Sequence, residues 1–161
     1  MKKFCLKNLS SLWGFTLIEL LVVVTIIGIL FGIGVAQYAN FNRSQILEQA
    51  AQDLKNNLRL AQTKAANGEK PNGCSVLNGY RVSFSSGASD TYTIQAMCGG
   101  SPTGPAKTFS LPPVVKFNPL PSPILFKVLA QGTDLRSDLT ISLTAFGKVK
   151  TIKVTKQGKI E

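Results

Sequence analysis

One carboxylate stands inside a long apolar run near the start of the chain. Glu19 is the only acidic or basic side chain from residue 8 to residue 42, and in residues 15–36 the only other polar side chains are those of Thr16 and Thr25. A carboxylate within a membrane-length apolar segment is costly, so it marks a functional site by default. The chemistry open to it is the pairing of its negative charge with a cation.

The apolar run has the length of a membrane span. As a helix, residues 15–36 would extend about 33 Å at about 1.5 Å per residue, and the apolar core of a bilayer is about 30 Å thick. Residues 1–14 carry three lysines and no acid, as cytoplasmic flanks do. We therefore expect a single-pass protein of the cytoplasmic membrane with its N-terminus inside. A secretory signal is less favoured, because its apolar core is shorter and its removal after Ala36 would discard Glu19.

The hexapeptide Gly14-Phe15-Thr16-Leu17-Ile18-Glu19 behind the basic leader resembles the cleavage and methylation signature of type IV prepilins and pseudopilins. This resemblance implies that a prepilin peptidase cuts between Gly14 and Phe15, and that the new amine of Phe15 is methylated. Glu19 would meet the Phe15 amine of a neighbouring subunit in a filament, since a paired carboxylate avoids the penalty of a lone one. The alternative for Glu19 is a simple interaction with its own helix dipole.

The helix is expected to continue beyond the apolar run. Residues 37–67 carry an apolar stripe at three- and four-residue steps, which is typical of an amphipathic helix: Ile46, Leu47, Ala50, Ala51, Leu54, Leu58, Ala61 and Ala65. Asn67-Gly68 is a helix stop signal. We expect one helix over residues 15–67. The alternative is two helices broken between Gln37 and Ser44.

Beyond residue 68 the apolar period changes to that of strands. Apolar and polar residues alternate, as in half-buried strands, in residues 80–85, 91–96, 140–144 and 151–155. Less regular strand candidates are residues 107–111, 114–117 and 124–129. The fold class predicted is α+β, with the long helix packed on a small antiparallel β-sheet domain of residues 68–161.

A second, weaker resemblance concerns the rest of the chain. A long helix followed by a β domain that ends in a hairpin is similar to the GspH/FimT group of minor pseudopilins and minor pilins. The segment Leu54–Ala66 and the closing segment Lys156-Gln157-Gly158-Lys159-Ile160 carry this similarity. It implies a minor subunit whose partners are other pilin or pseudopilin subunits.

The cysteines indicate an oxidising compartment. Cys5 lies in the leader, whereas Cys74 and Cys98 remain as an even pair in a chain expected to leave the cytoplasm. A disulfide between them is the favoured interpretation, and two free thiols are the alternative. A metal site is less favoured, because two cysteines and no histidine fall short of four ligands.

The charge is strongly basic, at +10 for the whole chain. Without its three leader lysines the chain has 15 basic and 8 acidic residues, a net charge of +7. Five lysines are concentrated near the C-terminus: Lys148, Lys150, Lys153, Lys156 and Lys159. A solvated strand face is the favoured interpretation, and a polyanion contact such as DNA is the alternative. Some minor pilins bind DNA through a C-terminal Gly-Arg-x-Arg motif, from which Gly158-Lys159-Ile160-Glu161 departs at both arginines.

An enzyme is not expected. The chain has no histidine, which excludes histidine-based catalytic triads and zinc triads. Asp134 and Asp138 are weak candidates for calcium, so we expect no metal and no cofactor. The predicted function is that of a structural subunit of a type IV pilus or a type II secretion-like pseudopilus. A pilus-borne DNA receptor and a membrane-anchored surface protein that never polymerises are the alternatives.

Overall fold

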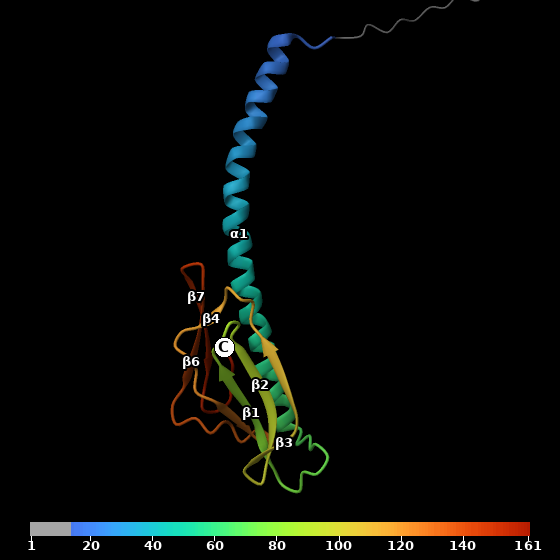
Figure 1. The fold of residues 1–161 in the computed structure, drawn as a ribbon, viewed down its shortest axis with the longest axis vertical. Helices are drawn as coiled ribbons and strands as arrows, with labels where there is room; N and C mark the ends of the chain where they lie inside the picture. The colour runs from blue at the N-terminus through green and yellow to red at the C-terminus, as the bar shows by residue number, and fades with distance from the viewer. Residues whose placement is uncertain (1–13) are drawn as a thin grey trace, which may run out of the picture. The chain divides into compact units, whose positions relative to one another are not determined.

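The computed structural model describes residues 14–161, and the chain divides into two compact units, Met1–Asn40 and Phe41–Glu161 (Figure 1). One helix, α1, runs over Leu17–Ala66 without the break considered between residues 37 and 44. It ends at the predicted stop: the Asn67 N–H still donates to the Thr63 carbonyl at 2.9 Å, and Gly68 follows with a φ of +64°. A glycine in this left-handed conformation is a common helix terminator.

The membrane span predicted over residues 15–36 lies at the beginning of α1. Within residues 14–161, no helix meets the combined length and apolarity that a bilayer crossing requires. The span over residues 15–36 stays a prediction. The leader before Gly14, with Cys5, lies outside the described residues.

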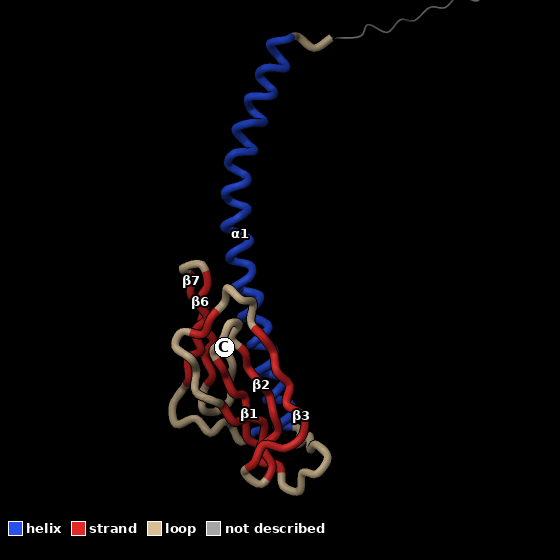
Figure 2. The backbone as a smooth tube through the Cα atoms, in the orientation of Figure 1, coloured by secondary structure: helices blue, strands red, loops and turns tan. Residues whose placement is uncertain are grey.

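Two antiparallel sheets follow the helix (Figure 2). The first has the strand order β3-β2-β1-β5, with β1 at Leu77–Ser85, β2 at Thr91–Cys98, β3 at Ser101–Ser110 and β5 at Ile124–Lys127. The second has the order β4-β6-β7, with β4 at Lys116–Phe117, β6 at Leu139–Ala145 and β7 at Lys148–Val154. A short 3₁₀ turn, η1, lies at Val128–Ala130. The α+β class with a helix on antiparallel strands is confirmed.

One core joins the second half of α1 to both sheets. The predicted helix stripe is buried from Leu47 onward, and Leu54 and Leu58 have no exposed surface; Ile46 is half-buried at its edge. Alternate residues of the strands complete the core, as their period of two requires: Tyr80, Val82, Tyr92, Ile94, Phe126, Ile141, Leu143, Ile152 and Val154.

Two polar contacts fix the helix against the strands. The Asn57 amide donates to the Tyr92 hydroxyl at 2.8 Å, and the Gln62 amide donates to the Gly158 carbonyl at 3.0 Å. The first contact holds α1 to β2, and the second holds it to the turn after β7. Because the burial of polar groups is costly unless they are hydrogen-bonded, these two pairs also fix the position of α1 along the sheets.

The less regular strand predictions needed correction. β3 begins at Ser101, six residues before the predicted start at Lys107. The prediction missed this first half of the strand because it contains Pro102, Gly104 and Pro105. These residues are depleted in strands but tolerated at a sheet edge, where β3 lies. The segment 114–117 contributes only Lys116–Phe117, and the segment 124–129 turns into η1 after Lys127.

Candidate functional site

The hexapeptide that carries the cleavage resemblance forms the start of α1. Gly14, Phe15 and Thr16 precede the first helical residue, Leu17. The Glu19 N–H donates to the Thr16 hydroxyl oxygen at 3.3 Å, and the Leu20 N–H donates to the Thr16 carbonyl at 3.2 Å. Thr16 is therefore the N-cap of the helix and Glu19 its third residue, which is the sequence pattern of a capping box.

Thr16 is a residue that the sequence interpretation missed. Its signal was present as Thr-x-x-Glu directly before an apolar run, a pattern typical of helix starts. The cap has a consequence for the site. Because the helix begins at Leu17, the Gly14–Phe15 bond lies in non-helical chain, where a peptidase can bind it as an extended segment.

Glu19 has no ionic partner in its own surroundings. Among the described residues, none forms an ion pair with it, and from residue 14 to residue 42 the chain contains no basic side chain. The two other polar side chains of the apolar run are hydrogen-bonded within the helix. The Thr16 hydroxyl accepts the Glu19 N–H at 3.3 Å, and the Thr25 hydroxyl donates to the Val22 carbonyl at 2.8 Å. Glu19 is thus the group of this segment that requires an external partner wherever water is excluded.

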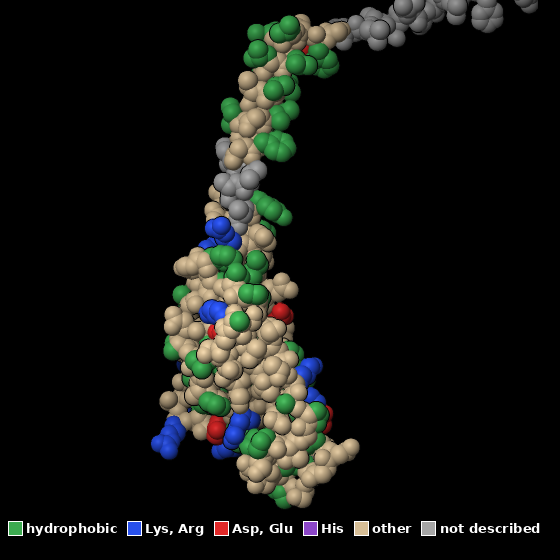
Figure 3. All heavy atoms as spheres, in the orientation of Figure 1, with side chains coloured by type: hydrophobic (Ala, Val, Ile, Leu, Met, Phe, Trp, Pro, Cys, Tyr) green, Lys and Arg blue, Asp and Glu red, His purple; other side chains and the backbone are tan. Residues whose placement is uncertain are grey.

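Around Glu19 the helix surface is apolar on all sides. Each large apolar side chain described from Phe15 to Phe31 is between 46% and 83% exposed. Figure 3 shows hydrophobic side chains over the visible face of this part of α1. Monomeric soluble proteins rarely expose a continuous apolar surface of this kind. The segment has the surface of an element that is buried by something outside its own chain.

The five C-terminal lysines do not form one cluster. Lys148 and Lys150 share the α1-facing side of β7 with Ile152, whereas Lys153 lies on the opposite side, because successive residues of a strand alternate. Lys148 donates to the Ser44 hydroxyl, and the Lys150 amine lies 2.7 Å from the Glu48 carboxylate. The hydrogen bond from the Lys150 amine holds the pKa of the Glu48 carboxyl below its usual range.

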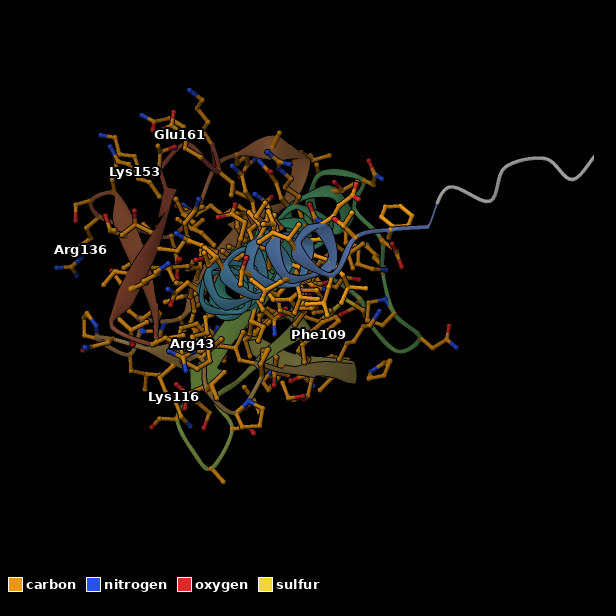
Figure 4. All side chains as sticks on the ribbon, turned by 90° about the horizontal axis from the view of Figure 1, so that it is seen from above. Arg43, Phe109, Lys116, Arg136, Lys153 and Glu161 are labelled. Atoms are coloured by element: carbon orange, nitrogen blue, oxygen red, sulfur yellow. A yellow bond between two sulfur atoms is a disulfide. The ribbon has the colours of Figure 1, made fainter. Side chains whose placement is uncertain are left out.

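The remaining lysines of this group lie around the end of β7. The Lys153 amine is 3.0 Å from the Asp138 carboxylate, and the Lys159 amine is 2.5 Å from Glu161. Figure 4 shows Lys153 and Glu161 on the side of the domain away from Arg43. The Arg43 guanidinium lies over the Phe146 ring, in the turn that precedes Lys148. Three of the five lysines are therefore paired with acids, and the group is divided between two faces. This arrangement does not favour a single phosphate-binding surface.

Two acids singled out as weak calcium ligands have structural partners. Asp134 accepts a hydrogen bond from the Leu125 N–H at 2.8 Å, and Asp138 accepts one from the Lys156 N–H at 3.2 Å. Within the described range 14–161, no three Cys, Asp or Glu residues are grouped so that they could hold a metal ion.

Cys74 and Cys98 form the predicted disulfide. It connects the loop after α1 to the last residue of β2, across 24 positions of sequence. The loop is fixed further by Tyr80, whose hydroxyl donates to the Glu69 carbonyl at 2.9 Å.

Comparison with known proteins adds one finding. The family described as Prokaryotic N-terminal methylation motif matches residues 14–35. No curated protein and no solved structure gives a significant match. The matched range begins at Gly14 and includes Phe15, Glu19 and the exposed apolar surface of α1. It supports a type IV pilin-like or pseudopilin-like chain that is processed by a prepilin peptidase.

Proposed function

We propose that this chain is a structural subunit, a minor pilin or pseudopilin, of a type IV pilus or a type II secretion-like pseudopilus. A prepilin peptidase removes residues 1–14, the amine of Phe15 is methylated, and the subunit waits in the cytoplasmic membrane before it joins an extracytoplasmic filament. The observation that carries this proposal is the methylation-motif match at residues 14–35. The exposed apolar surface of the same segment gives a physical reason for assembly.

The exposed apolar surface of α1 is expected to be buried first in the lipid of the membrane and then in the core of a filament. Burial of apolar surface gains about 25 cal/mol per Å², so the segment is unstable in water and is accommodated first by lipid. Lipid is as apolar as the helix, and within it helices associate through packing and polar contacts. A filament core of packed helices replaces lipid contacts with helix contacts without exposing the segment to water.

Glu19 supplies the polar contact that selects the register of assembly. Its carboxylate lacks an ionic partner among the described residues, and cleavage creates an amine at Phe15 of every subunit. The reference pKa of such an amine is about 7.7 to 8.0, so it is largely cationic at neutral pH. Pairing of Glu19 with the Phe15 amine of a neighbour joins the two charges within the apolar core, where each alone is penalised.

The proposal is tested by fractionation of cells that make the protein from its own gene locus. Filaments are sheared from the cell surface, and the membrane and filament pools are probed with an antibody to the β domain. We expect the processed chain in both pools when the peptidase is present, and only the unprocessed chain in the membrane pool of a peptidase-deficient strain. A processed chain confined to membranes in cells that visibly carry filaments would contradict the proposal and favour a non-polymerising surface protein.

A further inference from the structure

A cleft of about 670 Å³ opens at the end of the β domain where α1 terminates. One wall is the last turns of α1 with Leu60 and Lys64, another is the loop Glu69–Asn72, and the third is the β3 segment Thr103–Lys107. In Figure 1 the loop that leaves α1 and the beginning of β3 lie at the same end of the domain. The volume is within the range of about 300–1,000 Å³ that is usual for binding sites.

The floor of the cleft is apolar and consists of buried side chains. It is formed by Ile94 and Ala96 of β2, each less than 5% exposed, together with Tyr80 of β1. The Tyr80 hydroxyl donates to the Glu69 carbonyl, and the Lys64 amine lies over the Tyr80 ring, 5.9 Å from its centroid. Such a floor binds aliphatic or aromatic side chains.

The loop and β3 meet at the base of the cleft. A side chain at Gly104 would place its Cβ 2.7 Å from the Pro71 side chain, so only glycine permits this approach. The Cys74–Cys98 disulfide ties the same loop to the end of β2. The wall is therefore fixed before any ligand arrives, which reduces the entropic cost of binding.

The rim of the cleft is cationic. Three lysines from three different elements line it, Lys64 of α1, Lys70 of the loop and Lys107 of β3, against the single acid Glu69. Lys64 pairs with Glu69. Lys107 lies over the Phe109 ring, with its amine 5.0 Å from the ring centroid, and among the described residues no acid forms an ion pair with it.

We propose that this cleft binds an acidic, apolar segment of a partner protein, with apolar side chains on the Ile94–Ala96 floor and carboxylates at the lysine rim. Charge complementarity of this kind increases the association rate and the specificity of an interface. A segment with several carboxylates fits better than a small ligand with one, because the cations stand on separate walls. The inference does not depend on filament assembly.

The test uses the full mature chain, methyl-labelled and held in neutral maltoside micelles, with methyl NMR as the readout. The probe is an acetylated peptide amide of alternating leucine and glutamate, and the matched control peptide has glutamine at each glutamate. We expect saturable shifts of the Ile94 and Ala96 methyls with the acidic peptide, and no saturable shift of the Ile152 methyl in the other sheet. The affinity should fall as ionic strength rises, because exposed charge pairs are screened.

Variants of the rim distinguish charge recognition from simple apolar binding. Lys107→Gln should weaken peptide binding about two- to fivefold, the effect of an exposed ion pair. Glu69→Gln should strengthen it, because that change frees Lys64 from its own partner. Lys127→Gln, on β5 and outside the cleft, is the matched control and should leave the affinity unchanged.

Three outcomes would overturn the proposal. Equal affinities for the glutamine peptide and the acidic peptide would show that the cleft does not recognise the negative charge of the ligand. Equal shifts at Ile152 and Ile94 would show binding without a defined site. Binding of hexanoate as tight as that of the acidic peptide would assign the cleft to small carboxylates rather than to a protein segment.

Discussion

The Asp90 carboxylate accepts a 2.8 Å hydrogen bond from the backbone N–H of Phe117, and this bond joins the connection between β1 and β2 to β4 of the other sheet. Asp90 also accepts hydrogen bonds at 3.2 Å from the Gly87 N–H and from the Lys116 amine. Its side chain is only 3% exposed. Burial by itself raises the pKa of Asp90, but these three donors outweigh it and hold the pKa below its usual range.

Replacement of Asp90 by asparagine should therefore destabilise the domain at neutral pH. The change removes a buried charge that accepts three hydrogen bonds, and hydrogen bonds to charged groups are worth about 1.5–3 kcal/mol each. We expect the free energy of unfolding to fall by roughly 2 kcal/mol. Urea unfolding of the mature chain, followed by the near-UV circular dichroism of its buried tyrosines, measures this loss. An unchanged midpoint would show that Asp90 is not a link between the sheets.

The stability that Asp90 contributes should depend on pH. Because its pKa is lower in the folded chain than in the unfolded chain, where it is about 3.9, the contribution is fully present above that value. It is lost as the pH falls through the lower folded pKa. The difference in unfolding free energy between wild type and Asp90→Asn should thus be constant from pH 7 to about pH 5 and shrink below about pH 4. A difference that persists at pH 2 would assign the effect to shape rather than to charge.

The processing site makes a prediction about mass. The mature chain should begin with N-methylated Phe15, and intact-mass measurement of protein from its own cells should show loss of residues 1–14 and gain of one methyl group. Gly14→Val should block cleavage, because a branched side chain hinders close approach of the peptidase to an extended backbone. A mature N-terminus near Gln37, as signal peptidase would leave it, contradicts the assignment.

Glu19→Ala should impair assembly and leave membrane insertion and cleavage intact. The Phe15 amine of a neighbour would enter an apolar core without its partner, which is strongly unfavourable, while membrane insertion loses a small penalty. Comparison of the membrane and sheared-filament pools measures this. Glu19→Gln tests the charge at nearly constant shape, and Asp53→Asn, on the second half of α1, is a control for loss of an acid. Normal incorporation of Glu19→Ala would restrict Glu19 to a role within its own helix.

The disulfide predicts both thiol content and stability. Titration of unfolded, unreduced protein matured outside the cytoplasm should detect no free thiol from Cys74 or Cys98. Loop-entropy arguments for a separation of 24 residues give a stabilisation of roughly 3 kcal/mol, so the double variant Cys74→Ser, Cys98→Ser should unfold at lower denaturant concentration. Equal unfolding midpoints of the oxidised and reduced wild-type protein would show that the loop needs no covalent tie.

The sequence alone determined those features that depend on local periodicity and on short motifs. The single helix, its end at Asn67-Gly68 and the regular strands around Tyr80, Tyr92 and Ile141 follow from where apolar residues recur, because that recurrence states which side of each element is buried. The cleavage and methylation motif at Gly14–Glu19 is equally local. The N-cap at Thr16 could have been predicted in the same way from Thr-x-x-Glu, although the sequence interpretation missed it.

The tertiary structure alone decided what depends on which elements become neighbours. β3 tolerates Pro102 and Pro105 because it is the edge of its sheet, and an edge position cannot be read from the strand itself. The strand period puts Lys150 and Lys153 on opposite sides of β7, but only the tertiary structure decided their partners, Glu48 for Lys150 and Asp138 for Lys153. The Lys150 pair forms only when β7 packs against α1, and the Lys153 pair forms only when β6 and β7 are paired in their sheet.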